Sequence, residues 1–295
     1  MTRHRLQGKV AVVTGASQGL GQYLSMGLAR EGARVVVAAR NADRLAAVAG
    51  AIDRDGGTAL AVPTDLTNER ACAALIEATL DRFGTIDMLV LNAGSATYGR
   101  LEELDDFAPI RTALDVNFFG AAYPTFRAIP HLIASKGTIV YVTSGSGYLP
   151  LPGYLGYTTS KHAMNGFFET LRLEMVDHGV RVLAVNPGEM YNDDGAGRSI
   201  LGPDGSQHKL DLSPGRERDI HRVPASSVAE KVLDAIVEGR REIDLAPRIQ
   251  KVACRARPFV PGFVDKRILK RASEMRQALD PELGRPRPTT GDRPG

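Results

Sequence analysis

The stretch YTTSK places a phenol, Tyr157, four residues before an ammonium, Lys161. Side chains at positions i and i+4 lie on the same face of a helix, so the two groups are expected side by side. A phenol ionises near pH 10, and general acid–base work at neutral pH therefore needs a nearby positive charge that favours the phenolate. An ammonium about 4 to 5 Å away supplies roughly 3 to 4 kcal/mol at an effective dielectric near 20. The pair predicts a tyrosine that exchanges a proton with a bound substrate.

A glycine-rich turn, TGASQGLG at residues 14–21, follows the first apolar run and precedes a helical stretch. Its three glycines let the backbone approach a pyrophosphate closely, and the amides at the start of a helix favour an anion. The glycines fall as GxxxGxG rather than as the GxGxxG of the general dinucleotide fingerprint. The turn predicts a phosphate-binding site, and the alternative is a strand-to-helix turn that binds nothing.

Short apolar runs rich in Val, Ile and Leu alternate with segments of helical period. The runs are 9–14, 33–39, 58–62, 86–91, 137–143, 180–185 and 242–246. Strands that are apolar on both faces and alternate with helices are typical of a parallel sheet covered on two sides. The sequence therefore predicts an α/β fold: a doubly wound, Rossmann-type, seven-stranded parallel sheet with helices on both faces.

The composition indicates the size and the class of the protein. The chain has 295 residues and 43% hydrophobic content, enough for one large domain with a core. Two distant cysteines provide neither a disulfide framework nor a metal-binding pair, so we expect a reducing, cytoplasmic location and no metal site. Neither a signal-peptide core nor an apolar run long enough to span a membrane is present, which predicts a soluble chain.

The net charge of +3 is unevenly distributed. Residues 251–279 hold eight Lys or Arg and two acids, whereas 280–295 are balanced, which leaves the first 250 residues slightly acidic. This distribution argues against a nucleic-acid-binding core. We expect a catalytic domain over 1–250, a basic amphipathic extension over 251–280, and a disordered tail over 281–295, which is rich in Pro, Gly and charge.

The order and spacing of these motifs resemble the short-chain dehydrogenase/reductase family, in its single-domain branch. The resemblance covers about residues 7–246. It rests on TGxxxGxG, on Asn92-Ala93-Gly94 after the fourth run, on Asn117 and Ser144, and on YTTSK. The resemblance implies an NAD(P)-dependent enzyme that acts on CH–OH or C=O groups.

The resemblance implies a catalytic role for Asn117, Ser144, Tyr157 and Lys161. Tyr157 would exchange the proton, and Lys161 would also bond the ribose hydroxyls beside the nicotinamide. Ser144 would hydrogen-bond the substrate oxygen; Ser146 competes for this role, but Ser144 precedes Tyr157 by thirteen positions, which is the family's spacing. Asn117 would hold a helix carbonyl and a water in a proton relay toward Lys161.

The resemblance also implies which residues hold the cofactor. Besides Tyr157 and Lys161, they are Gly15, Ser17, Gly19, Leu20, Arg40, Asp65, Leu66, Asn92, Ala93, Gly94, Pro187 and Gly188. After the second run, Ala39 stands where NAD enzymes place an acid, and Arg40 can form bidentate hydrogen bonds to the 2′-phosphate of NADP. NADP is therefore favoured over NAD, while Gln18 stands where many NADP-preferring relatives carry a basic residue. The alternative is that Arg40 is only a solvated residue at the start of a helix.

Two further positions leave alternatives open. Asp65 either contacts the adenine amino group, as the resemblance implies, or caps the next helix alongside Thr67. The turn Asn186-Pro187-Gly188 continues the resemblance, but Asn192 stands where many relatives carry a Thr that bonds the nicotinamide amide. This departure affects the detailed amide contact rather than the cofactor site as a whole.

The substrate pocket is expected to have apolar walls with hydroxyl groups at its edges. The long connection 189–224 is either a mobile substrate lid or an irregular surface insertion. The other expected walls, 95–98, 148–154 and 190–191, offer tyrosines, leucines and a methionine without Lys or Arg. We therefore expect a bulky, uncharged, largely apolar substrate. His162 is interpreted as a helix-surface residue rather than a second acid.

The predicted reaction is hydride transfer between NADPH and a ketone or aldehyde, or the reverse on a secondary alcohol. The alternative is an NADP-binding sensor or scaffold without turnover. An epimerase or dehydratase of the family's extended branch fits poorly, because the glycine spacing is that of the short branch and no sizeable C-terminal sugar-nucleotide domain follows. We expect a small-molecule partner, no nucleic acid, and a homodimer or homotetramer.

The basic extension carries one apolar stripe at helical spacing. Its members are Val264, Ile268, Ala272, Met275 and Leu279, with lysines and arginines around them. Such a stripe suits a helix packed on its own domain or on a second subunit. We favour this interpretation; the alternative is peripheral contact of residues 251–279 with an anionic membrane surface.

Overall fold

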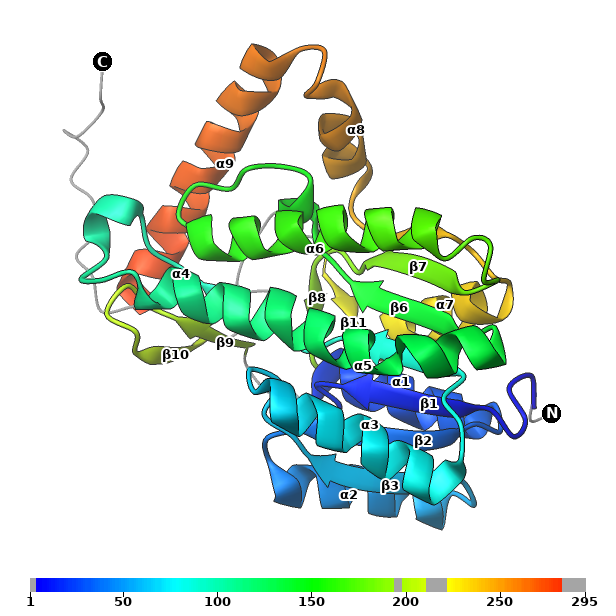
Figure 1. The fold of residues 1–295 in the computed structure, drawn as a ribbon. Coiled ribbons are helices and arrows are strands. Elements are labelled where there is room, and N and C mark those ends of the chain that lie inside the picture. The colour runs from blue at the N-terminus through cyan, green and yellow to red at the C-terminus, as the bar shows by residue number, and fades with distance from the viewer. Residues whose placement is uncertain (1–3, 194–197, 211–221, 283–295) are drawn as a thin grey trace.

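The computed structural model describes residues 4–193, 198–210 and 222–282, and its core is one parallel sheet (Figure 1). The strands are β1 (Val10–Thr14), β2 (Arg34–Ala39), β3 (Thr58–Pro63), β4 (Met88–Leu91), β6 (Thr138–Val142), β7 (Arg181–Asn186) and β12 (Glu242–Asp244). They lie in the order β12-β7-β6-β4-β1-β2-β3, and every neighbouring pair is parallel. The predicted seven-stranded, doubly wound sheet is confirmed, with each strand within two residues of its predicted apolar run at both ends.

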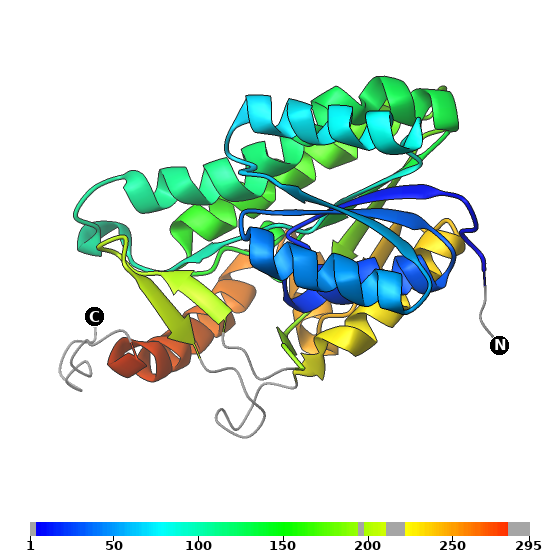
Figure 2. The same ribbon diagram turned by 90° about the horizontal axis from the view of Figure 1, so that it is seen from below.

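Helices cover both faces of the sheet because the central strands are apolar on both sides. Every residue of β1, β4 and β6 is buried. One face packs on α1 (Gly19–Arg30), α2 (Ala42–Arg54) and α7 (Ala225–Val237). The other packs on α3 (Glu69–Phe83), α5 (Gly120–Ser135) and α6 (Leu155–Glu174). Figure 2 shows the sheet between these two layers.

A π-helical turn interrupts the long helix that precedes β6. The helix begins as α4 (Ala108–Ala113), widens over Leu114–Phe119, and continues as α5. Turns of this kind are frequent at functional sites. This one contains Asn117, which is completely buried.

The connection expected over 189–224 is partly regular. β8 (Met190–Tyr191) pairs with β11 (Val223–Pro224), while β9 (Arg198–Leu201) and β10 (Gln207–Leu210) form an antiparallel hairpin. β9 also pairs with β5 (Ala96–Thr97). The described part is therefore built from strands rather than irregular, and the remainder, 194–197 and 211–221, lies outside the described residues.

The C-terminal extension forms two helices, α8 (Arg248–Ala256) and α9 (Pro261–Glu282), that make a hairpin (Figure 1). The predicted stripe faces inward: Val264 and Leu279 are buried, and the three residues between them on the stripe are half-buried. Arg276 forms an ion pair with Glu103 at 2.8 Å, which ties α9 to the domain. Residues 283–295, most of the expected disordered tail, lie outside the described residues. Among the helices of the described part, none has both the length and the apolar character needed to cross a membrane.

Candidate active site

The predicted site residues gather where the strands of the sheet end. Thr14 and Gly15 follow β1, Asn92 follows β4, and Ser144 follows β6. The carboxyl edge of an open parallel sheet is the place where such folds bind ligands. The fold therefore brings motifs that are far apart in sequence to one edge.

The glycine-rich turn after β1 is shaped for close backbone approach. Gly15 and Gly19 adopt positive φ angles of 64° and 55°. A Cβ atom at Gly15 would lie 2.8 Å from the Cα of Ala93, and one at Gly21 would lie 2.3 Å from the carbonyl oxygen of Gly15. No side chain caps the start of α1, and no acid lies in its first turn. The first amides of α1 thus suit an anion such as a phosphate, so the turn fits a dinucleotide.

The predicted cofactor residues of this region play different structural parts. The side chains of Leu20 and Leu66 are buried in the core on opposite faces of the sheet, so only their main chains can face a ligand. Ser17 is half-buried. Asn92 donates from Nδ2 to the carbonyls of Thr14 at 3.2 Å and Gly15 at 3.3 Å. Asn92 therefore joins the ends of β1 and β4.

The Thr14 hydroxyl completes that junction. It accepts hydrogen bonds from the amides of Asn92 at 3.1 Å and Ala93 at 3.2 Å.

A Cβ atom at Gly94 would lie 3.4 Å from Asn117 Oδ1 and 3.8 Å from Lys161 Nζ. Gly94 thus leaves open a space that is flanked by two polar groups of the predicted catalytic set.

Two arginines lie beside the turn on its β2 side. Arg40 is exposed directly after β2, as predicted. Arg44, in the first turn of α2, donates to the side-chain oxygen of Gln18. Gln18 stands where relatives often carry a basic residue, and this position is therefore contacted by Arg44 of α2. Arg44 was not among the predicted residues, although its spacing of four from Arg40 is a sequence signal that could have identified it.

Asp65 closes a turn before α3. Its carboxylate accepts hydrogen bonds from the Thr67 hydroxyl at 2.8 Å and the Thr67 amide at 3.0 Å. These bonds, with a smaller contribution from the Arg40 guanidinium, hold the pKa of Asp65 below its usual value. The N-cap of α3 is Asn68, whose side chain accepts from the amides of Arg70 and Ala71. The interaction with Thr67 resembles the expected capping role, but the cap itself is Asn68.

Tyr157 and Lys161 lie together on α6. The Lys161 Nζ atom is 5.7 Å from the centroid of the Tyr157 ring. Lys161 is only 3% exposed, and its amine donates to the carbonyl of Val142 at 2.8 Å. The amine is thus placed both beside the phenol and at the end of β6, two residues before Ser144.

Asn117 connects three segments of the site. Its Nδ2 donates to the Ser95 carbonyl at 2.9 Å and to the Ser160 hydroxyl at 2.8 Å. Its Oδ1 accepts from the Ser95 amide at 2.7 Å. Asn117 therefore fixes the chain after Gly94 to α6. Ser160 lies inside YTTSK and was not singled out by its sequence pattern.

Ser144 caps a short 3₁₀ turn, Gly145–Gly147, by accepting from the Ser146 amide at 3.2 Å. Ser146 is buried, whereas Ser144 is half-buried, so Ser144 is the more accessible of the two hydroxyls. A Cβ atom at Gly145 would lie 1.7 Å from Nε2 of Gln250 on α8. The Gln250 side chain thus lies against the residue next to Ser144. Sequence spacing gave no signal for this contact.

An apolar cluster surrounds Tyr157 on the side of the expected substrate walls. Tyr98 packs edge-on against Tyr154 at 5.1 Å between ring centroids, and Tyr154 packs against Tyr157 at 6.4 Å. Ile200 of β9 and Leu279 of α9 belong to the same cluster. Segments 95–98 and 148–154 were predicted here, whereas the contribution of α9 was not.

The turn after β7 lies at the same edge. Asn186 donates to Asp244 at 3.0 Å, and Gly188 has a φ of 69°. A Cβ atom at Gly188 would lie 2.8 Å from the Leu245 carbonyl oxygen, so Pro187 and Gly188 form a turn that requires glycine. Asn192 Oδ1 would lie 2.7 Å from a Cβ atom at Gly19, which places this side chain over the glycine-rich turn.

His162 is exposed, and its Nδ1 lies 2.9 Å from the Thr158 carbonyl oxygen, as expected of a helix-surface residue.

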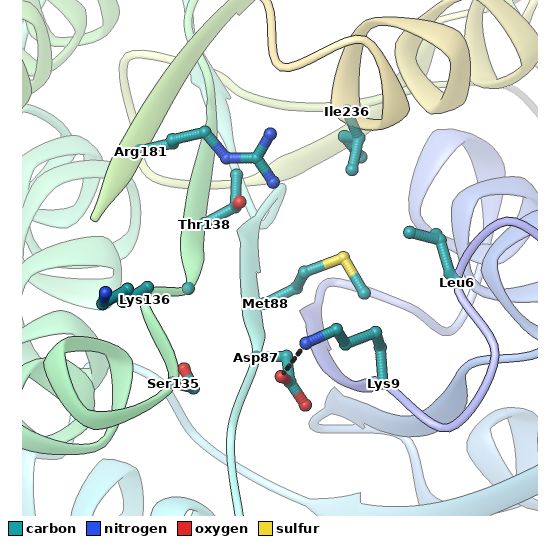
Figure 3. Close-up of a pocket in the computed structure, with 10 residues that line it drawn as sticks. Leu6, Lys9, Asp87, Met88, Ser135, Lys136, Thr138, Arg181 and Ile236 are labelled. Carbon is teal, nitrogen blue, oxygen red and sulfur yellow. Dashed lines mark hydrogen bonds and ion pairs between the residues drawn. The ribbon is translucent and has the colours of Figure 1, made fainter. Parts of the chain in front are cut away.

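A small pocket lies at the opposite, amino-terminal edge of the sheet (Figure 3). Leu6, Met88 and Ile236 line it, as do Lys9 and Asp87, which form an ion pair at 2.8 Å. Asp87 also accepts from the Val10 amide at 2.9 Å, so it joins the starts of β1 and β4. None of the predicted site residues lines this pocket, which is a structural feature away from the candidate active site.

Comparison with known proteins identifies the relatives of this chain. The profile of the short chain dehydrogenase family matches residues 9–196. The 11-beta-hydroxysteroid dehydrogenase-like 3 of Arabidopsis thaliana is 39% identical over 63% of this chain, and the match covers 60% of that protein. The 11-beta-hydroxysteroid dehydrogenase A of Sesamum indicum is 35% identical over 80% of this chain and 68% of that protein. The chain thus spans between about three fifths and two thirds of the length of these two relatives.

A solved structure shows the same architecture. The crystal structure of a metagenomic short-chain oxidoreductase in complex with NADP superposes with a TM-score of 0.67. It is 29% identical, and the match covers 82% of this chain and 99% of that one.

Proposed function

This chain belongs to the short-chain dehydrogenase/reductase family, and we propose that it is an NADP-dependent oxidoreductase that interconverts a ketone or aldehyde and the corresponding alcohol. The observation that carries the proposal is the pairing of Tyr157 with the buried amine of Lys161 on α6. The amine and the phenol lie at the carboxyl edge of the sheet, where folds of this kind bind their ligands, so both groups are placed to meet a substrate and a dinucleotide.

In the proposed reaction, the residues of this chain handle the proton and the substrate oxygen. The dinucleotide, when bound, supplies or accepts the hydride at its nicotinamide. Tyr157 gives its hydroxyl proton to the oxygen of the substrate carbonyl, or takes it from the alcohol in the reverse direction. Lys161 holds its amine beside the Tyr157 ring. Ser144 donates a hydrogen bond to the same substrate oxygen, which stabilises developing negative charge there.

Asn117 and Lys161 also shape the place where the nicotinamide ribose would lie. Both polar groups flank the open side of Gly94, within 4 Å of a Cβ position that the glycine leaves empty. Lys161 would donate to the ribose hydroxyls, and Asn117 would hold Gly94 and Ser95 in the required path. Gly15, Gly19 and the first amides of α1 would hold the pyrophosphate.

Preference for NADP over NAD is proposed from the charge beside the turn. Ala39 replaces the acid that would repel a 2′-phosphate, and Arg40 and Arg44 both lie on this side of the turn. Their guanidinium groups can bind a phosphate with charge-assisted hydrogen bonds. Asp65 accepts from Thr67 and has further lone pairs that would be open to the adenine amino group.

The proposed substrate is bulky, uncharged and largely apolar. The side chains that pack around Tyr157 are tyrosines and aliphatic residues, including Ile200 and Leu279. The related plant proteins are hydroxysteroid dehydrogenases by name, which is consistent with a large hydrophobic alcohol or ketone. A sensor or scaffold without turnover would not need the full set of Asn117, Ser144, Tyr157 and Lys161.

A ketone panel graded by size tests this proposal. Purified protein is given NADPH, and the loss of NADPH absorbance is followed with each ketone, from small aliphatic compounds to steroid-sized ones. Turnover that rises with apolar bulk supports the proposal. Binding of NADPH without turnover on any member would favour the sensor.

We further propose a cytoplasmic homodimer or homotetramer. An exposed aromatic group at the α5–α6 surface supports self-association: Phe119 packs against Tyr123 and Phe118, and Phe118 against Phe167. Phe126, further along α5, is 68% exposed. Light scattering of the purified chain would give the number of subunits.

A further inference from the structure

The turn of the α8–α9 hairpin exposes large apolar side chains next to basic ones. Phe259 is 84% exposed, Phe263 is 62% exposed, and Val260 is also exposed. One helical turn further along α9, Lys266, Arg267 and Lys270 lie exposed on the same helical face as Phe263. We name these six residues the tip patch.

The charge of this region is strongly one-sided. Residues 248–271 contain eight Lys or Arg and a single acid, Asp265. Asp265 is paired with Arg257 at 2.9 Å, so its charge is already balanced within the hairpin. Arg267 lies over the Phe263 ring, with 5.0 Å between its guanidinium carbon and the ring centroid. The tip patch is therefore apolar at its centre and cationic at its margin.

Among the residues that the structure describes, none covers the tip patch, whose members are all exposed. The inward stripe of α9, from Val264 to Leu279, packs on the remainder of the chain, and the tip patch is on the other side of the helix. Figure 1 shows the hairpin turn projecting away from the sheet and from α6. Large apolar side chains that lie exposed together on a projecting element indicate an interaction site.

We propose that the tip patch binds an anionic membrane surface, with Phe259 and Phe263 inserted at the level of the headgroups. Aromatic side chains partition into that layer, while Lys and Arg beside them stay near the lipid phosphates. Each basic residue close to such a surface adds to the attraction. A second copy of the chain is a poorer occupant, because a symmetric contact would bring two cationic patches together.

The contact would hold the active site in a defined place relative to the membrane. From Phe263 to Leu279, α9 covers about 24 Å at the rise of a helix. Leu279 belongs to the cluster that includes Tyr157, and Gln250 of α8 lies against Gly145. Both helices of the hairpin therefore connect the tip patch to the candidate active site. Delivery of an apolar substrate from the membrane to the active site rests on the proposed function. The membrane contact itself does not rest on that function.

Vesicle co-sedimentation with the full chain tests the proposal. The protein is mixed with vesicles of phosphatidylcholine alone and of phosphatidylcholine with phosphatidylserine, over a series of salt concentrations. We expect binding to the anionic vesicles, at least tenfold weaker binding to the neutral ones, and loss of binding as salt is raised. In the double variant Lys266→Gln/Arg267→Gln, binding should weaken by about fivefold for each charge removed. Phe263→Ser should also weaken it.

The matched control is another exposed phenylalanine–arginine pair. Phe107 is 61% exposed, and Arg111, also exposed, follows it at the same spacing of four residues as Arg267 follows Phe263, far from the hairpin in sequence. Phe107→Ser/Arg111→Gln should leave vesicle binding unchanged, and the tip variants should keep the rate on a water-soluble ketone. The proposal is overturned if the full chain stays in solution with both kinds of vesicle, or if the control weakens binding as much as the tip variants. It is also overturned if light scattering shows that Phe263→Ser dissociates an oligomer, because a second copy then occupies the patch.

Discussion

The Asn117 side chain donates a hydrogen bond to the Ser160 hydroxyl at 2.8 Å, across 43 residues of sequence. Ser160 in turn donates to the Tyr157 carbonyl at 2.7 Å. The π-helical turn that carries Asn117 is thereby joined to the first turn of the helix that carries Tyr157 and Lys161. Ser160 thus connects Asn117, which is proposed to order the chain beside the nicotinamide ribose, with Tyr157, which is proposed to transfer the proton.

Replacement of Tyr157 by phenylalanine tests the proton-transfer role. Tyr157→Phe removes only the hydroxyl, so the ring still packs against Tyr154. We expect turnover to fall by about 10² to 10⁴ or more, the range for loss of a general acid–base group, while the dissociation constant for NADPH changes little. Single-turnover kinetics and fluorescence titration measure the two quantities. As control, Tyr154→Phe should retain turnover within a few-fold, and comparable turnover in Tyr157→Phe would refute the assignment.

Replacement of Ser160 by alanine tests the connection between Asn117 and α6. The variant leaves one donor of the Asn117 amide without its partner, which should lower the free energy of unfolding by about 1 kcal/mol. Because Asn117 then has fewer constraints, we also expect turnover to fall by about tenfold, with a smaller loss of NADPH affinity on the ribose side. Thr79→Val is a matched control, since Thr79 is buried and donates only within its own helix, to Leu75. A loss of stability with unchanged turnover in both variants would show that Ser160 is only structural.

Replacement of the two arginines tests the cofactor preference. Loss of a charged hydrogen bond typically costs about 1.5 to 3 kcal/mol, so Arg40→Ala should weaken NADPH binding by roughly 10- to 100-fold. Arg44→Ala should have a smaller effect, because part of its side chain is engaged with Gln18. NADH affinity should be nearly unchanged in both. Arg54→Ala, exposed at the other end of α2, is the control. Equal losses for NADPH and NADH would mean that the arginines do not recognise the 2′-phosphate.

The sheet could be predicted because each of its strands carries a local signal. β1, β4 and β6 are buried on both faces, and their sequences are therefore apolar on both faces. This pattern is recognisable from the local sequence alone. The glycine turn also carries a local signal in its spacing, and Gly21 is required by a contact with the Gly15 carbonyl inside the motif, whereas the close contact of Gly15 with Ala93 is long-range. Tyr157 and Lys161 were predictable as a pair because helical spacing alone places them on one face.

The features of the site that the sequence did not predict depend on tertiary contacts. The π-helical turn around Asn117 adds only one residue to a helical repeat, which apolar periodicity does not resolve. β5 and β8 are two residues long, too short for any alternating pattern. Gln250 and Leu279 reach the site from the C-terminal hairpin, and their residue types alone do not distinguish them from surface or core positions.

Acidification tests the environment of Asp65. Its pKa is held below the usual value, chiefly by the Thr67 hydroxyl and amide, so the charged form is favoured in the folded state. A group with a lowered folded-state pKa stabilises the protein above its unfolded pKa, near 3.9, and this contribution is lost as the pH falls through the folded value. The Asp65→Asn variant lacks a titrating group. We therefore expect the thermal midpoint of the unchanged protein to fall more between pH 5 and pH 3 than that of Asp65→Asn.

The variant Thr67→Val separates the hydroxyl from the other contributions. It removes the largest cause of the lowered pKa but keeps the carboxylate and the amide donor. Its loss of stability in acid should lie between those of the unchanged protein and of Asp65→Asn. If Asp65→Asn loses as much stability in acid as the unchanged protein, the carboxylate contributes nothing to folding. A weaker NADPH affinity of Asp65→Asn at neutral pH would then leave the adenine contact as its role.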